Sequence, residues 1–178
     1  ETYPEISDVE IIGLVTDVIE SFKYEAKKKN IQMKFYFTGD INQDTYYFKT
    51  DAEKVRLIIS NLLSNAIKFS YNNGIVILEA CVKDKLLIIT VQDFGTGISE
   101  QNQKIIFDRF RRSDSGINSV VRGHGLGLSI NKAFIDMLQG TITVKTAAKK
   151  GTTFTVTLPY SEDISEGITL DGNELLFK

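Results

Sequence analysis

The sequence predicts an α+β fold, a two-layer α/β sandwich in which a mixed, mostly antiparallel sheet is packed on one face by three main helices. Three observations predict it. Segments with strand composition occur in pairs joined by short turns. Three longer stretches carry apolar residues at helical spacing. The regular alternation of single strands and helices that a doubly wound nucleotide-binding fold requires is absent.

The first part of the chain predicts one helix and two strands. Apolar residues recur at helical spacing over residues 8–29, with Asp8 as the expected N-cap and lysines in the last turn, where cations favour the helix dipole. Residues 31–37 begin with strict apolar and polar alternation, which predicts a strand. A polar turn over residues 38–45 then leads to a short strand at residues 46–49.

The middle of the chain predicts a second helix and a β-hairpin. We expect Asp51 to cap a helix over residues 52–69, whose apolar residues again follow helical spacing. The sequence Asn-Asn-Gly at residues 72–74 ends this segment as a turn. Residues 75–82 and 86–92 are rich in strand-forming residues and flank a short charged turn, which predicts the hairpin.

The remaining residues predict a glycine-rich loop, two further helices and a closing pair of strands. Residues 161–178 are acidic and lack a clear pattern, so we expect one domain over residues 1–160 followed by a C-terminal tail or linker. The expected elements between are a loop at 93–99, a short helix at 100–108, a mobile loop at 111–124, a helix at 125–138 with Gly140 as its stop signal, and strands at 141–147 and 152–158, the last ended by Pro159.

Composition and charge exclude several classes of protein. The 178 residues suit one domain, and 21 Lys and Arg against 23 Asp and Glu argue against a nucleic-acid-binding protein. Cys81 and His124 are the one cysteine and the one histidine, which excludes an internal disulfide, a cysteine-rich zinc site and a pair of histidines on a metal. No apolar run reaches the roughly 18 residues of a membrane span. We therefore expect a soluble intracellular protein.

Three polar residues share one face of the second helix. Asn61, Asn65 and Lys68 are spaced by four and three residues, which places them within about 60° of arc. An Asn carbonyl oxygen is a hard ligand that suits Mg²⁺, and the Lys ammonium suits phosphate. The face could hold a metal ion and a phosphate group, although a solvated polar helix face would show the same spacing.

Two glycine-rich segments add candidate nucleotide contacts. Asp93 ends a strand, where its carboxylate could accept a hydrogen bond from an exocyclic amine such as that of adenine, and Gly95 and Gly97 would let the backbone approach a flat ring. Residues 123–128 open a helix with three glycines at alternate positions, and bare amides at a helix N-terminus bind phosphate oxygens. A simple turn and a flexible hinge are the alternative interpretations.

In this order and spacing the segments resemble the conserved boxes of sensor histidine kinases. Residues 151–159 resemble the family's closing strand, so that the resemblance covers about residues 8–160. It implies the sandwich fold of the catalytic and ATP-binding domain, which is shared with gyrase B, an ATP-dependent chaperone and mismatch-repair ATPases in the GHKL superfamily. The matched boxes are the N box at residues 61–70, the G1 box at 93–98, the F box at 106–112 and the G2 box at 123–130.

The resemblance implies that the chain binds ATP and Mg²⁺ and gives each matched residue a role. Asn65 would hold Mg²⁺, with Asn61 near the phosphates. Lys68 and Arg112 would contact phosphate oxygens and, with Asn61, take part in catalysis. Asp93 would receive the adenine amino group. The other expected nucleotide contacts are Phe69 beside the base, Gly95, Gly97 and Ile98 around the adenine, the backbone of Gly123, His124, Gly125, Leu126, Gly127 and Leu128 around the phosphates, and Thr152 in the closing strand.

Three further residues have an alternative interpretation. Phe107 and Phe110 would anchor the loop at 111–124 as a lid over ATP, yet two phenylalanines three residues apart also form an ordinary core stripe. His124 stands where the family commonly has Thr or Ser. We expect it to be an exposed lid residue and not the histidine that accepts phosphate.

The function implied is transfer of the γ-phosphoryl group of Mg²⁺-ATP to a histidine on a separate dimerisation hairpin in two-component signal transduction. The alternatives are a GHKL-type ATPase, a serine kinase of the anti-sigma type, and a pseudo-enzyme that binds no nucleotide. Asn61 disfavours the ATPase, because those enzymes resemble each other in placing a glutamate there as general base for water, and asparagine cannot act as a base. The first helix and the F box fit histidine kinases better than the anti-sigma type, and the occupied polar positions disfavour a pseudo-enzyme.

The resemblance also implies partners outside this chain. The phosphoacceptor hairpin would lie upstream of Glu1, and a response-regulator receiver domain would take the phosphoryl group downstream. We expect the isolated domain to be a monomer and cytoplasmic, and the whole protein to be a homodimer. Membrane anchoring of the whole protein, the signal it senses and the identity of its response regulator are left open by the sequence.

Overall fold

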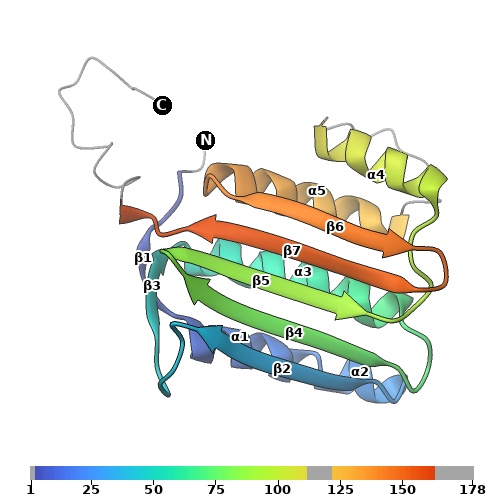
Figure 1. The fold of residues 1–178 in the computed structure, drawn as a ribbon, viewed down its shortest axis with the longest axis horizontal. Coiled ribbons are helices and arrows are strands. Elements are labelled where there is room, and N and C mark those ends of the chain that lie inside the picture. Colours follow the sequence, from blue (N-terminus) through green and yellow to red (C-terminus); the bar gives the residue numbers. More distant parts are fainter. Residues whose placement is uncertain (1–2, 112–121, 163–178) are drawn as a thin grey trace.

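A computed structural model describes residues 3–111 and 122–162, and the side chains within residues 3–106 and 127–162. Its main layer is a five-stranded sheet in the order β2-β4-β5-β7-β6, and β1 and β3 form a separate two-stranded sheet (Figure 1). In the main sheet β2 runs parallel to β4 and the other neighbours pair antiparallel, which confirms the expected mixed sheet. The strands are β1 (Ser7–Glu10), β2 (Gln32–Gly39), β3 (Tyr47–Thr50), β4 (Ile75–Lys83), β5 (Leu86–Asp93), β6 (Thr141–Ala147) and β7 (Gly151–Pro159).

Helices cover one face of the main sheet and leave the other face open (Figure 1). α3 lies in the middle of the helical layer and contacts both α1 and α5. The two-layer sandwich with three main helices on one face is therefore confirmed. The helices are α1 (Ile11–Ser21), α2 (Lys23–Lys28), α3 (Ala52–Phe69), α4 (Glu100–Arg111) and α5 (Arg122–Met137).

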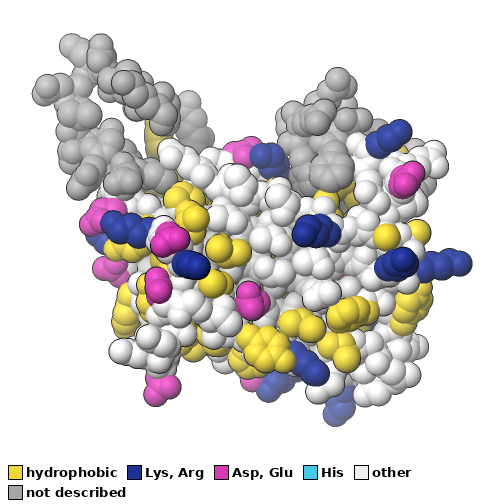
Figure 2. Space-filling model, in the orientation of Figure 1, with side chains coloured by type: hydrophobic (Ala, Val, Ile, Leu, Met, Phe, Trp, Pro, Cys, Tyr) yellow, Lys and Arg dark blue, Asp and Glu magenta, His cyan; other side chains and the backbone are white. Residues whose placement is uncertain are grey.

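Side-chain burial alternates along the central strands β4 and β5 and recurs every three to four residues along α3. Every second residue of β5 is buried, and the residues between them emerge on the open face, where Figure 2 shows polar and apolar side chains mixed. On α3 the buried residues recur every three to four positions and pack against the sheet. The core is formed by the side chains that both layers bury, among them Ile58, Ile59, Leu62 and Leu63 of α3, Leu78 of β4 and Leu87 and Ile89 of β5.

The helix expected over residues 8–29 is wrong at its start. Residues up to Glu10 form β1, which pairs with β3 across about forty positions of sequence, and a strand this short shows too little alternation to be distinguished from a helix start. Glu10 replaces Asp8 as the N-cap of α1. Its carboxylate accepts hydrogen bonds from the N–H groups of Ile12 and Gly13 at 2.8 and 3.0 Å.

The same expected helix is also interrupted at Phe22. The Ser21 hydroxyl donates to the Val18 carbonyl at 2.6 Å, which is the carbonyl that the Phe22 N–H would bond in a continuous helix. The Phe22 N–H bonds the Ile19 carbonyl at 3.1 Å, a tighter turn. The chain therefore forms two helices, α1 and α2, in place of one.

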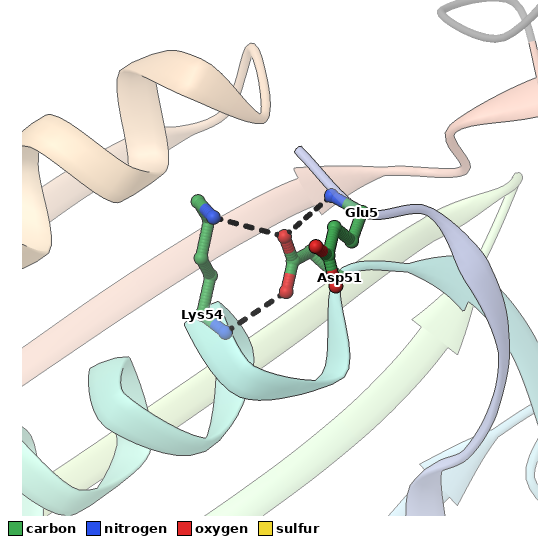
Figure 3. Close-up of polar contacts among 3 residues, drawn as sticks. All are labelled: Glu5, Asp51 and Lys54. Atoms are coloured by element: carbon green, nitrogen blue, oxygen red, sulfur yellow. Dashed lines mark hydrogen bonds and ion pairs between the residues drawn. The ribbon is translucent and has the colours of Figure 1, made fainter. Parts of the chain in front are cut away.

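Asp51 caps α3 as expected and also ties the N-terminal segment to this helix. Its carboxylate accepts the N–H groups of Lys54 and Glu5 at 3.1 and 2.8 Å, and the Lys54 ammonium lies 3.0 Å away (Figure 3). Burial alone would raise the pKa of Asp51, but these hydrogen bonds and the ammonium outweigh it and hold the pKa below its ordinary value. The carboxylate thus stays ionised beneath the helix that carries the N box.

The remaining expected elements are confirmed with small shifts in their ends. The helix expected at 100–108 continues to Arg111, and the one expected at 125–138 begins at Arg122. Most of the expected mobile loop at 111–124 lies outside the described residues. So does all of the expected tail beyond Glu162.

Candidate functional site

The three polar residues of the N box lie on α3 and differ in burial and in hydrogen-bond partners. Asn61 is half-buried, whereas Asn65 is 8% exposed and its Nδ2 atom has no hydrogen-bond partner among the described residues. Lys68 is exposed in the last turn, with its ammonium 5.6 Å from the centre of the Phe69 ring. A buried NH₂ group without an acceptor is costly, so Asn65 is the position on this face most in need of a ligand.

Asn61 connects the N box to the helix that carries the G2 box. Its Nδ2 donates to the Gly127 carbonyl at 3.2 Å and to Oδ1 of Asn131 at 2.9 Å. A Cβ on Gly127 would lie 3.3 Å from Cγ of Asn61, so this glycine allows the close approach. Leu128 follows with a buried side chain. The structure therefore brings the N box together with Gly127 and Leu128 of the G2 box on α5.

Asn131 was missed by the sequence analysis. It is wholly buried on α5, and its Nδ2 donates to the Ile58 carbonyl of α3 at 3.2 Å. A signal was available, since Asn131 stands in the apolar stripe of this helix between Leu128 and Ile135, where a polar side chain needs a partner.

Asp93 ends β5 with a carboxylate that is almost enclosed. It is 7% exposed, and its Oδ1 accepts the Gly95 N–H at 2.9 Å. Burial raises the pKa of Asp93 above its ordinary value, although hydrogen bonds from the backbone of Gly95 and Thr152 counteract part of this effect. A ligand N–H that reached this carboxylate would replace hydration that burial has removed.

The loop after Asp93 is held against the end of α3. The Thr96 N–H donates to the Phe69 carbonyl at 3.0 Å, and a Cβ on Gly95 would lie 1.9 Å from that same oxygen. Gly97 has a φ of +66°, and a Cβ on this residue would lie equally close to the Ala147 carbonyl oxygen. Both glycines are therefore required by backbone contacts.

Hydroxyl groups join this loop to the last two strands. The Ile98 N–H donates to Oγ1 of Thr146 at 2.9 Å, and the same hydroxyl lies 2.9 Å from Oγ1 of Thr152. It also donates to the Gly151 carbonyl at 3.0 Å. Ile98 and Thr152 are both buried. Thr152 therefore supports the base of the loop through its side chain.

The candidate residues gather at one end of the molecule. The end of α3, the loop after β5, the β6–β7 turn and the start of α5 all lie on the right in Figure 1. Gly123, His124, Gly125 and Leu126 lie in α5, and Phe107 and Phe110 lie in α4, but their side chains are outside the described ones. Arg112 lies outside the described residues altogether.

Two classes of feature are absent from the described part of the chain. Within residues 3–111 and 122–162, no helix is both long and apolar enough to cross a membrane. The same residues contain no cluster of three or more His, Cys, Asp and Glu that could bind a metal ion.

Comparisons with known proteins agree with this arrangement. Residues 50–162 match the family described as histidine kinase-, DNA gyrase B- and HSP90-like ATPase. The circadian input-output histidine kinase CikA of Thermosynechococcus vestitus is 37% identical over 150 residues, which are 84% of this chain and 20% of that protein. The chain thus spans about a fifth of the length of the curated CikA relatives it matches.

Solved structures share the fold. The catalytic domain of histidine kinase ThkA superimposes with a TM-score of 0.71 at 23% identity, covering 88% of this chain and 96% of that one. Full-length ShkA, solved in complex with AMPPNP, gives a TM-score of 0.73 at 26% identity, covering 89% of this chain and 32% of that one.

Proposed function

Because this chain belongs to the family of histidine kinase-, DNA gyrase B- and HSP90-like ATPases, as the catalytic ATP-binding domain of a sensor histidine kinase, we propose that it binds Mg²⁺-ATP and transfers the γ-phosphoryl group to a histidine outside this chain. The observation that carries the proposal is the buried Asp93 carboxylate beside a glycine loop fixed to the end of the N-box helix. The complex of the similar ShkA with AMPPNP, an ATP analogue, supports the nucleotide class.

Asp93 would select adenine by accepting its amino group. An enclosed carboxylate can only accept hydrogen bonds when ionised, so it favours adenine over guanine, which presents a carbonyl oxygen at the equivalent position. Gly95 and Gly97 keep side chains out of the loop, and Phe69 and Ile98 would supply apolar contacts to the base. Thr152 supports this loop from β7.

Mg²⁺ fits the amide residues of α3. The Asn65 side chain is buried, and its amide oxygen is the kind of hard ligand that Mg²⁺ prefers. Its Nδ2, which has no partner among the described residues, is a donor that would suit a phosphate oxygen. Asn65 would hold the ion, and the ion would neutralise phosphate charge. Asn61, Lys68 and Arg112 would serve at the phosphate end, with the backbone of residues 123–128 around the phosphates.

A histidine acceptor agrees better with these residues than water does. Asn61 holds the position where the ATPases of the superfamily place a basic glutamate, and its NH₂ group is bonded to α5. We infer that the acceptor lies on a dimerisation hairpin of the whole protein and that a receiver domain of a response regulator takes the phosphoryl group next. The domain would occupy residues 1–160 and lie in the cytoplasm, with residues 161–178 as a C-terminal tail or linker. The whole protein would be a homodimer.

Titration with a fluorescent ATP analogue, with and without Mg²⁺, tests the proposal. We expect one site per chain, tighter binding with Mg²⁺, and displacement by ATP. An Asn65→Ala variant should lose most of the Mg²⁺ effect, whereas Glu79→Gln on the open face of the sheet should bind like the unchanged chain. No binding, or binding that Mg²⁺ does not alter, would contradict the proposal.

A further inference from the structure

We propose that Asn131 is a positioning residue, which holds the side-chain amide of Asn61 so that Asn61 offers its carbonyl oxygen, and not its NH₂ group, to the cation or to a water bound at the phosphates. The inference rests on the proposed function, because it concerns the phosphate end of the same site. Asn131 lies on α5, is 0% exposed, and touches α3 through both atoms of its amide.

Two backbone carbonyls fix the orientation of both amides. The Ile58 carbonyl can only accept, so the group that Asn131 presents to it at 3.2 Å must be the NH₂. The oxygen of Asn131 then faces Asn61, which must present its own NH₂ at 2.9 Å. The Gly127 carbonyl lies 3.2 Å from the same nitrogen of Asn61 and can also only accept, so it requires the same orientation of the Asn61 amide.

This pattern uses both N–H bonds of Asn61. One hydrogen goes to Asn131 and the other to Gly127, so the nitrogen has nothing left to donate. Its Oδ1 has no hydrogen-bond partner among the described residues. A free carbonyl oxygen can ligate a cation or accept from a bound water, but it cannot bond a phosphate oxygen, which is also an acceptor.

Without Asn131 the orientation would be held by Gly127 alone. The Asn61 amide could then turn and present its NH₂ group outward for part of the time. Since one hydrogen bond contributes about 0.5–1.5 kcal/mol, its loss should weaken the preference of the Asn61 amide for this orientation by about 2- to 10-fold. A purely structural role of Asn131 as a polar link between helices predicts no such change in Asn61.

The first measurement uses the chain without nucleotide. In the ¹⁵N-labelled protein, the side-chain NH₂ of Asn61 should exchange slowly with solvent, and Asn131→Leu should make it exchange about fivefold faster. Ile135→Val is the matched control, since Ile135 is also 0% exposed on the same side of α5 but has no contact with Asn61 among the bonds described. If the Asn61 NH₂ of the unchanged chain exchanges as fast as an exposed amide, the proposal is wrong, whatever the variants do.

The second measurement is the affinity for the fluorescent ATP analogue with Mg²⁺. Asn131→Leu should bind about 2- to 10-fold more weakly, and Ile135→Val within about twofold of the unchanged chain. In an Asn61→Ala background, Asn131→Leu should have no further effect, because the amide that it positions is gone. Equal effects of Asn131→Leu in both backgrounds would overturn the inference while leaving nucleotide binding intact. Failure of the unchanged chain to bind would overturn the proposed function as well.

Discussion

The burial of Asp93 favours ligand binding but lowers the stability of the protein without a ligand. Its burial favours a strong hydrogen bond to a ligand amine, but the same burial raises the pKa of the carboxyl and makes the ionised form costly when no ligand is present. The hydrogen bond from Gly95 offsets only part of that cost. A residue that destabilises the empty protein at neutral pH is typical of a binding site.

Replacing Asp93 by Ala should remove the preference for ATP over GTP. In the proposed site the carboxylate is the group that would distinguish the amino group of adenine from the carbonyl of guanine, so ATP affinity should fall by about 10- to 100-fold, while GTP affinity changes little. Competition of each nucleotide against the fluorescent analogue measures both. Equal affinities for ATP and GTP in the unchanged chain would show that the role given to Asp93 is wrong.

Asp93 and Asp51 should affect the pH dependence of stability with opposite signs. The raised pKa of Asp93 means that the folded state holds its proton more tightly, so its contribution falls as pH rises above the ordinary value of 3.8. The lowered pKa of Asp51 gives a contribution that is fully present above 3.8 and is lost as pH falls through the folded value. Urea unfolding of Asp93→Asn and Asp51→Asn from pH 3 to pH 7 measures both.

We therefore expect Asp51→Asn to lower the free energy of unfolding most at neutral pH and progressively less in acid. Asp93→Asn should lower the free energy of unfolding least at neutral pH and more in acid, relative to the unchanged chain. The exposed Asp17→Asn serves as the control, with a difference that is small throughout. If the two buried aspartates gave pH slopes of the same sign, the electrostatic account of one of them would be contradicted.

At the scale of elements, α3 was predicted with both of its ends because its signals are local. Asp51 is a capping residue, the apolar stripe is long, and the turn sequence Asn-Asn-Gly follows at residues 72–74. β1 and the break at Phe22 were not predicted, because they depend on pairing with β3 and on one serine hydroxyl that competes for a carbonyl. Among site residues, the motif positions followed from resemblance, whereas Asn131 depends on which helices pack together.

Lys29 stabilises the end of α3 that carries Lys68 and Phe69. Its ammonium donates to the carbonyls of Ile67, Lys68 and Ser70 at 2.8, 3.0 and 2.5 Å, which are groups that a helix C-terminus leaves without partners. The positive charge also complements the negative end of the helix dipole. A residue from the end of α2 thus holds the helix end against which the loop after Asp93 is fixed.

Lys29→Met should therefore destabilise the chain and loosen the loop after Asp93. We expect a loss of about 1–2 kcal/mol in unfolding free energy, since the ammonium is partly exposed, and faster amide exchange at Thr96, whose N–H bonds the Phe69 carbonyl. The control is Lys27→Met, which removes the same charge from an exposed position in the last turn of α2. Similar effects from both variants would mean that the capping contacts contribute nothing beyond net charge.

At the scale of the whole molecule, the groups that we propose to hold the nucleotide lie at one end of the sandwich, and the rest of the fold supports them. α3 connects the N-terminal segment to this end of the molecule, because its N-terminus is tied to that segment through Asp51 and its C-terminus to the loop after Asp93 through Phe69. No histidine side chain lies in the described part of the site, because His124 is the one histidine of the sequence and its side chain is outside the described ones. Asn61 cannot act as a base, and its NH₂ group is held by α5.

The isolated chain should accordingly turn over ATP very slowly and leave itself unlabelled, yet phosphorylate a supplied helical hairpin that carries the acceptor histidine. Phosphoryl transfer needs charge neutralisation, positioning and an in-line nucleophile, and the proposed site supplies the first two. A positioned nucleophile can be worth several kcal/mol, so its absence should reduce turnover by more than about 100-fold. Radiolabelled ATP, with the chain alone and with the hairpin added, measures both reactions. Label on His124 with the chain alone would show that the acceptor is not external, whereas rapid phosphate release without the hairpin would favour the ATPase class.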